Sequence, residues 1–391
     1  MTPGRAIYDP FAAAVLDDPY PVYARLRAAA PVYRSEEHDF WALSRHGDVK
    51  AALADAGLFS SRNGVSLFHA WGPDAARTAS FIAMDAPGHT RLRKLTAPPF
   101  SRRQIAAMEP RIREMARLRL AALRDMPALV DVAASYAALL PMDVICEMTA
   151  VPAADREQVR AAAVQMTQAE QPRGGAFRRE AITWLAAYYA ALTADLRRAP
   201  RDDLTSALIL AGLPDSEIIP ALFLLIAAGH ETTGLTIGNA IYQGWVHPHV
   251  QQAGLSGRAG DWVSETLRFD GANQLIARVL TRPGVLHGIS IPEGARILLL
   301  PASANRDSSA FPDPDRFDLD RRPSQASGLI AFGQGPHYCL GAGLAHMQAR
   351  IALEELGRVA AGYEIDPGGL KRTRSSQFRG FTALPCSLAR A

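Results

Sequence analysis

Residues 331–341 read AFGQGPHYCLG and place a single cysteine, Cys339, in a glycine-rich, proline-stiffened loop. The next segment, 342–361, has apolar residues at helical spacing. A thiolate in an apolar interior needs a cation or several hydrogen-bond donors, and glycines let backbone N–H groups approach the sulfur closely. A helix that begins just after Cys339 adds the positive end of its dipole. The stretch therefore predicts a cysteine presented to a metal, with a small buried core cysteine as the alternative.

The loop carries a set of residues at fixed offsets that packing alone does not require. In this pattern it resembles the cytochrome P450 family, the haem-thiolate monooxygenases. The resemblance implies a mainly α fold with small β-sheets, in which a triangular prism of helices surrounds a buried haem b. It also implies that Cys339 is the axial ligand of the haem iron. The cofactor-binding residues implied in the loop are Phe332, Gly333, His337, Cys339 and Gly341.

Length and composition indicate one large domain over residues 1–391, because no linker, repeat or low-complexity run interrupts the chain. The family resemblance implies a small β-containing lobe, approximately 1–60 plus 274–301 and 363–391, with the remainder helical. The formal net charge of +3 is small beside 42 basic and 39 acidic side chains, so nucleic-acid binding is not expected. The first thirty residues contain no signal-peptide or anchor pattern, and the three cysteines are sparse. We therefore expect a cytoplasmic, soluble, bacterial-type monomer without a membrane partner.

Residues 59–81 are polar and broken by glycine, yet they carry large apolar side chains. In the family the equivalent loop covers the substrate pocket, which makes these side chains candidates for substrate contact. Anchoring of a long loop is the alternative. The candidates here are Leu67, Phe68, Trp71 and Phe81.

His89 and Arg93 lie four residues apart and therefore share a helical face. Two cationic donors so placed suit a carboxylate. The resemblance implies that this pair binds a haem propionate, with Arg278 and His337 as further donors. A solvated basic helix face is the alternative.

The apolar run that starts near Pro214 and continues to about Val246 predicts a helix roughly 45 Å long. A helix this long and apolar should pass through the centre of the molecule. The hydroxyl of Thr232 lies four residues after Ala228 and can bond back to that carbonyl, while Gly229 leaves room for the cofactor. This element resembles the oxygen-activation groove of the family, which implies proton delivery by Glu231 and Thr232 and haem contact by Ala228 and Gly229. A polar patch that caps a kink is the alternative.

Glu265 and Arg268 are three residues apart on a predicted helix and can pair. The resemblance implies that an arginine of the proline-rich segment, expected to be Arg316, joins this structural pair. Residues 270–273 read DGAN where many relatives have a proline, which leaves the path of the pocket wall open. Beyond the 59–81 loop, the side chains expected to face the substrate are Leu225, Gln274, Leu275, Ile276 and Phe378.

These features imply a monooxygenase that activates O2 and hydroxylates, epoxidises or demethylates a small apolar molecule, in a setting such as secondary metabolism. No Gly-x-Gly-x-x-Gly fingerprint follows a predicted strand, so electrons from NAD(P)H should arrive through a ferredoxin and a ferredoxin reductase. Two other classes stay open: a peroxide-driven or C–C coupling oxidase of the same fold, and a non-catalytic haem-thiolate sensor. Residues that could dock an acidic ferredoxin, or form only a solvated face, are Arg91, Lys94, Arg102 and Arg103.

Overall fold

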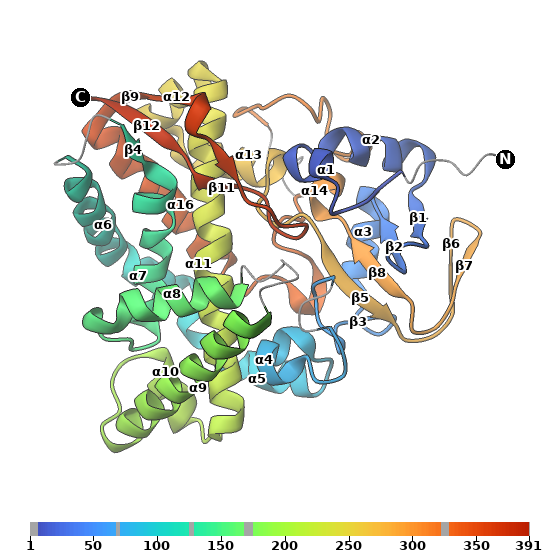
Figure 1. The fold of residues 1–391 in the computed structure, drawn as a ribbon, viewed down its shortest axis with the longest axis horizontal. Coiled ribbons are helices and arrows are strands. Elements are labelled where there is room, and N and C mark those ends of the chain that lie inside the picture. Colours follow the sequence, from blue (N-terminus) through green and yellow to red (C-terminus); the bar gives the residue numbers. More distant parts are fainter. Residues whose placement is uncertain (1–6, 68–70, 125–128, 168–174, 322–327, 391) are drawn as a thin grey trace.

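The computed structural model describes residues 7–67, 71–124, 129–167, 175–321 and 328–390. It is mostly helical with small sheets, which confirms the predicted fold class. In Figure 1 most helices gather around α11, and the larger sheet lies on the opposite side of the molecule. The helices are α1 (Ala13–Asp17), α2 (Tyr20–Ala29), α3 (His46–Ala54), α4 (Ala76–Ala79), α5 (Gly88–Thr96), α6 (Arg102–Arg124), α7 (Leu139–Met148), α8 (Arg156–Thr167), α9 (Gly175–Arg198), α10 (Leu204–Leu210), α11 (Asp215–Val246), α12 (Pro248–Ala253), α13 (Ala259–Phe269), α14 (Pro301–Ala304) and α16 (Ala342–Val359).

Helix α11 is the central element, as its apolar sequence predicts. It begins directly after Pro214, and Asp215 and Glu217 in its first turn complement the helix dipole. Its 32 residues pack against α7, α9, α13 and α16. Among the described helices it is the one long and apolar enough to cross a membrane, but 56% of its most apolar window is buried inside the structure. Its apolar surface therefore serves the protein core.

A five-stranded sheet in the order β1-β2-β8-β5-β3 forms the larger β-structure. Only β2 and β8 run parallel, and the other neighbours are antiparallel. Side chains alternate along β8: Leu298 packs with α2, whereas Ile297 and Leu299 pack with α3. The sheet is therefore covered on both faces. Its strands are β1 (Val32–Ser35), β2 (Phe40–Leu43), β3 (Phe59–Ser60), β5 (Ile276–Leu280) and β8 (Arg296–Leu299).

The C-terminal strands form a separate sheet. Strand β12 (Pro385–Arg390) pairs with β9 (Ala360–Ile365) and β4 (Val130–Asp131), and it does not join the five-stranded sheet. The reason is connectivity, since β9 follows directly from α16, which packs on α6 and α11. This part of the predicted β lobe thus lies among the helices (Figure 1). Two hairpins complete the strands: β6 (Gly284–Leu286) with β7 (Ile289–Ile291), and β10 (Lys371–Arg372) with β11 (Phe381–Ala383).

Candidate active site

A cavity of ≈ 280 Å³ lies between α11 and the cysteine loop, and its walls are mostly aliphatic and aromatic. Segments distant in sequence meet here, from α5, α7, α11, β5, the loop 331–341 and the turn at 377–378. Most of the predicted site residues line this one space. They are Phe81, Arg93, Leu225, Ala228, Gly229, Thr232, Ile276, Arg278, Phe332, Gly333, His337, Cys339, Gly341 and Phe378.

The cysteine loop is closed by a hydrogen bond from the Cys339 N–H to the Phe332 carbonyl, 2.8 Å. Gly335 has φ +69°, and a Cβ there would lie 2.8 Å from Cα of Ala54 in α3, so the close packing of loop and helix requires glycine. Helix α16 starts three residues after the cysteine. Burial raises the pKa of the Cys339 thiol, while the Gly341 N–H and the charge of Arg93 lower it. The loop is therefore poised to hold a thiolate once a metal cation supplies the remaining stabilisation.

Four hydrogen-bond donors, the cations Arg93 and Arg278 and the histidines His89 and His337, meet at one edge of the cavity. The rings of His89 and His337 lie 4.1 Å apart, and His337 Nε2 is 2.9 Å from Ser61 Oγ. Burial, together with the charges of Arg278, His89 and Arg93, lowers the pKa of His337 to about 3. Burial also lowers the pKa of Arg278 to about 10, against the opposite effect of the Asp85 charge. The edge is thus strongly electropositive and disfavours protonation of its histidines.

This cluster fits a haem dianion. His89 Nε2 is buried without a hydrogen-bond partner, and His89 and Arg278 are each 3% exposed. In the part of the chain that the structure describes, none of the four donors forms an ion pair with a carboxylate. The Arg93 guanidinium donates to the Tyr338 carbonyl, and the Arg278 guanidinium donates to the Ala277 carbonyl. Buried cations are normally paired, so these donors suit the two propionates of a haem whose iron faces Cys339. Among the described residues, no group of three or more His, Cys, Asp or Glu side chains is arranged to hold a metal ion.

Helix α11 provides the opposite wall. Thr232 Oγ1 donates to the Ala228 carbonyl at 3.0 Å, which confirms the predicted back-bond, and Thr236 donates to the Thr232 carbonyl at 2.8 Å. Both threonines line the cavity, whereas the half-buried Glu231 does not. The space beside Gly229 is taken by Ile145, since a Cβ at 229 would lie 3.1 Å from that side chain. Glycine at this position thus allows α7 to approach α11.

The predicted substrate contacts divide into two groups. Phe81, Leu225, Ile276 and Phe378 line the cavity. Leu275 does not: alternation along the strand that becomes β5 turns it into the core beside α2, where it is 0% exposed. Leu67 and Trp71 also lie outside the lining: Leu67 packs in the same core, and the Trp71 ring centroid lies 4.6 Å from Cζ of Arg296. The Gln274 side chain accepts a hydrogen bond from the Tyr23 hydroxyl and donates one to the Gly271 carbonyl. Phe68 is outside the described residues.

Several lining residues were not predicted. Val65, Phe100 and Ile145 come from segments without a chemical motif, and their apolar side chains do not differ in sequence from core residues. Asn273 also lines the cavity. The unusual DGAN run could have indicated it, because an amide beside a pocket wall is a departure from an apolar pattern.

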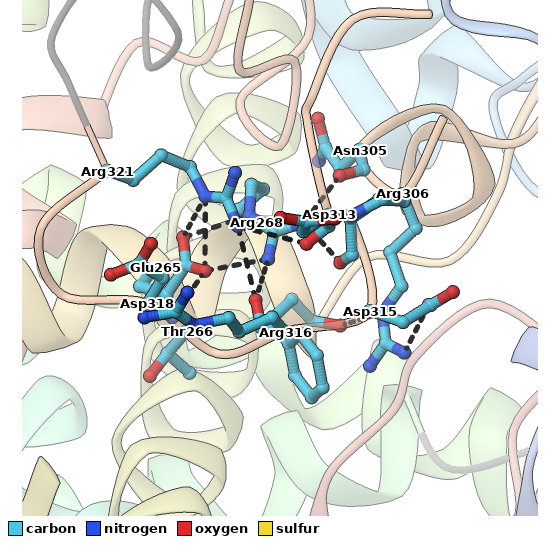
Figure 2. A network of polar contacts seen from close by, with 12 residues as sticks. Glu265, Thr266, Arg268, Asn305, Arg306, Asp313, Asp315, Arg316, Asp318 and Arg321 are labelled. Atoms are coloured by element: carbon cyan, nitrogen blue, oxygen red, sulfur yellow. Dashed lines mark hydrogen bonds and ion pairs between the residues drawn. The ribbon is translucent and has the colours of Figure 1, made fainter. Parts of the chain in front are cut away.

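Glu265 and Arg268 pair as expected, at 2.6 Å and with side chains only 4% and 2% exposed. The predicted third member, Arg316, is wrong. Figure 2 shows that Arg321 reaches Glu265, with Nε 3.2 Å from Oε2. Arg316 contributes only its backbone carbonyl, which accepts from Arg268 at 3.0 Å and from Arg321 at 3.1 Å. The turn at 313–316 directs this carbonyl inward, so the Arg316 side chain is exposed.

A mainly helical fold with a cysteine loop, a buried cationic cluster and a polar notch in its central helix around one cavity defines a haem-thiolate protein. Comparisons with known proteins agree. The cytochrome P450 family model matches residues 261–356. The chain is similar to cytochrome P450 123 of Mycobacterium tuberculosis, with 41% identity over 98% of this chain and 97% of the relative. It is 34% identical to a vitamin D(3) 25-hydroxylase of Pseudonocardia autotrophica, over 99% and 98% of the two chains.

The fold is similar to the solved structure of CYP109Q5 from Chondromyces apiculatus, with a TM-score of 0.88, 32% identity and 98% of each chain covered. This chain therefore belongs to the cytochrome P450 family. It is a P450 monooxygenase, an oxidoreductase that binds haem iron, as the sequence predicts.

Proposed function

We propose that this chain, as a single cytoplasmic domain and a monomer, hydroxylates, epoxidises or demethylates a small apolar organic molecule with O2. The observation that supports this most directly is the shared cavity: Cys339, the cationic edge and Thr232 border the same mostly apolar space. A haem held there supplies the activation of O2, which the thiolate ligand favours. The protein then has to position substrate, exclude water and deliver protons.

The residue roles follow from position. Cys339 would bind the iron, and His89, Arg93, Arg278 and His337 would hold the propionates through charge-assisted hydrogen bonds. Phe332, Gly333, Gly341, Ala228 and Gly229 would contact the haem. Thr232 already bonds Ala228, and exchange of that bond for a water molecule would let Thr232 and Glu231 organise protons above the cofactor.

Electrons would come from NAD(P)H through a ferredoxin reductase and a ferredoxin. Of the four basic residues expected to dock a ferredoxin, Arg91 forms an ion pair with Glu217 of α11, so its charge is already partnered. Lys94, Arg102 and Arg103 are exposed and form no ion pair within the described ranges. These three charges remain available to steer an acidic ferredoxin.

The first test is the absorption spectrum of the dithionite-reduced protein with carbon monoxide. Wild type should give the red-shifted Soret band of thiolate-ligated haem, and Cys339→Ser should lose it. Cys386→Ser, whose side chain is buried in β12, is the matched control and should keep the band. A Soret band at the position of histidine-ligated haem, or the absence of bound haem, in folded wild-type protein would reject the proposal.

Turnover then separates the remaining classes. Product formation with O2, ferredoxin and reductase supports the monooxygenase. Product with peroxide alone supports the peroxide-driven or coupling oxidase. No product in either system, with a thiolate band present, supports the sensor.

A further inference from the structure

Two segments that are distant in sequence, 272–274 and 377–379, form one wall of the cavity. Asn273 forms an antiparallel β-bridge with Phe378, and a backbone hydrogen bond of 2.8 Å flanks this bridge on each side. Both residues of the bridge line the cavity. The two segments are thus paired as a short ribbon whose one end faces the site.

Phe378 borders two cavities. Besides the main cavity it lines, together with Leu16 and Tyr23, a second cavity of ≈ 10 Å³. Protein interiors are normally packed without such spaces, and this one has room for about one water molecule. Neighbouring side chains therefore do not enclose Phe378 on all sides, and its position depends on how its backbone is anchored.

Arg379, the next residue, anchors this backbone. Its guanidinium donates from Nε to the Asp270 carboxylate and from Nη1 to the Asp17 carbonyl at the end of α1, each at 2.8 Å. The two side chains of the ion pair are only 8% and 2% exposed. The Arg379 carbonyl accepts from Asn239 of α11 at 3.1 Å. Arg379 thus connects the cavity wall to the N-terminal helices and to the central helix.

Asp270 is held in turn by two further helices. Gln243 of α11 donates to its carboxylate at 3.0 Å, and the hydroxyl of Tyr20 in α2 donates at 3.1 Å. Burial alone would raise the pKa of Asp270, but the charges of Arg379 and of two other arginines hold it below its ordinary value. The carboxylate therefore stays ionised near neutral pH and keeps its partners.

We propose that Arg379 is a positioning residue that, through its ion pair with Asp270, holds Phe378 as a fixed wall against which the substrate is oriented. The inference rests on the proposed function, since it requires an apolar substrate in this cavity. Arg379 does not line the main cavity, so it acts only through its neighbour. A substrate misplaced by about 1 Å can react about 100-fold more slowly, so a wall that shifts slightly matters for the reaction.

The test uses haem-loaded protein and probes that require no known substrate: imidazole, 1-phenylimidazole, 1-benzylimidazole and clotrimazole. The imidazole nitrogen of each binds the haem iron, while the remainder of the larger probes fills the cavity. Binding is followed by the red shift of the Soret band. Imidazole alone reports access to the iron. The ratio of its Kd to the Kd of a larger probe therefore measures how well the cavity walls fit that probe.

Phe378→Ala should reduce the ratio about fivefold for at least one larger probe, the size expected for loss of an aromatic contact. Arg379→Met should reduce the same ratio at least about threefold, while imidazole itself binds as in wild type. In the Phe378→Ala background, Arg379→Met should change the ratio by less than about 1.5-fold, because the wall is already absent. Arg379→Lys should give an intermediate ratio, since one ammonium group does not replace the fork that bonds Asp270 and Asp17 together.

The matched control is Arg113→Met. Arg113 bonds the buried Glu355 at 3.0 Å and does not line the cavity, so this change breaks another buried ion pair without moving the wall. Its ratios should equal those of wild type. Equal losses in Arg113→Met and Arg379→Met would overturn the inference, because the effect would then follow from lower stability.

The carbon monoxide spectrum is recorded for each variant first. A missing thiolate band in wild type rejects the proposed function itself. With the band intact, the inference alone is overturned if no ratio responds to Phe378→Ala, or if Arg379→Met leaves the ratio unchanged or lowers it equally with and without Phe378. If Arg379→Met does not retain haem, Arg379→Lys, alone and combined with Phe378→Ala, decides by the same criteria.

Discussion

Replacement of Arg321 by methionine tests the arginine that the structure assigns to the Glu265 pair. Arg321 Nε lies 3.3 and 3.2 Å from the two carboxylate oxygens, and its guanidinium also donates to the Pro312 carbonyl at 2.8 Å. Its side chain is 7% exposed, so these bonds are not exchanged with water. Arg316→Met is the matched control, because the Arg316 side chain is exposed and only its backbone takes part.

The magnitude follows from what remains after the change. Breaking a buried ion pair costs about 3–5 kcal/mol when one charge is left alone. Here Glu265 keeps Arg268 at 2.6 Å and the Asp318 N–H at 2.9 Å, so we expect about 3 kcal/mol for Arg321→Met, at the lower end of that range. Arg316→Met should change stability by less than about 0.5 kcal/mol, as for other exposed side chains.

Thermal unfolding of the haem-loaded protein, followed by circular dichroism and by loss of the thiolate band, measures the difference. An unfolding entropy of about 2.1 cal/mol/K per residue gives about 0.8 kcal/mol/K for 391 residues, so about 3 kcal/mol corresponds to about 4 °C. Arg321→Met should melt lower by that amount and Arg316→Met should match wild type. Equal losses in both variants, or a larger loss in Arg316→Met, would refute the assignment.

Three further outcomes are expected. Burial lowers the pKa of His230 to about 4, so between about pH 6.5 and pH 4 this histidine is protonated in the unfolded chain but not in the folded one. Lowering the pH from 7 to 5 should therefore reduce the free energy of unfolding by about 2 kcal/mol through this group. Denaturant titrations of His230→Gln at both pH values should lack this part of the decrease. Gly335→Ala should destabilise the cysteine loop and weaken the thiolate band more than Gly288→Ala, which has a similar positive φ but no neighbour within 4 Å; equal effects would mean that contact with α3 is unimportant. Thr232→Ala should keep substrate binding but divert reducing equivalents to peroxide, measured as the ratio of product to NAD(P)H consumed, and unchanged coupling would remove Thr232 from proton delivery.

Much of the fold could be predicted because its strongest features are local. The apolar run of α11 spans 32 residues, and the helix ends within a residue of the predicted limits. Fixed offsets also indicated Cys339, His337 and Thr232, which line one cavity, since a glycine-rich loop and one helical turn determine their neighbours. These elements depend little on the rest of the chain.

The errors occurred where a side chain's direction depends on distant partners. Arg316 and Arg321 both lie in a segment without regular structure, where no periodicity states which side chain points inward. Leu275 and Ile276 are adjacent apolar residues, and only the pairing of β5 with β8 decides which one faces the cavity. The sheet that contains β12 could not be predicted for the same reason, because its partner β4 lies more than 250 residues away.

The buried arginines show why the cationic edge of the cavity indicates an external anion. Four arginines are buried in the described part of the chain, and three of them reach a carboxylate: Arg268 pairs with Glu265, Arg379 with Asp270, and Arg306 contacts Asp315. Arg278 is as buried as these, yet it has no such partner, and the neighbouring His89 has an unsatisfied nitrogen. A fold that pairs its other buried arginines would not leave this group uncompensated unless a bound dianion completed it. Haem-free protein should for this reason be less stable than the holoprotein. Arg278→Leu should weaken haem retention and thereby reduce the difference in stability between the haem-loaded and haem-free forms. If this difference is the same in Arg278→Leu and wild type, Arg278 does not bind a propionate.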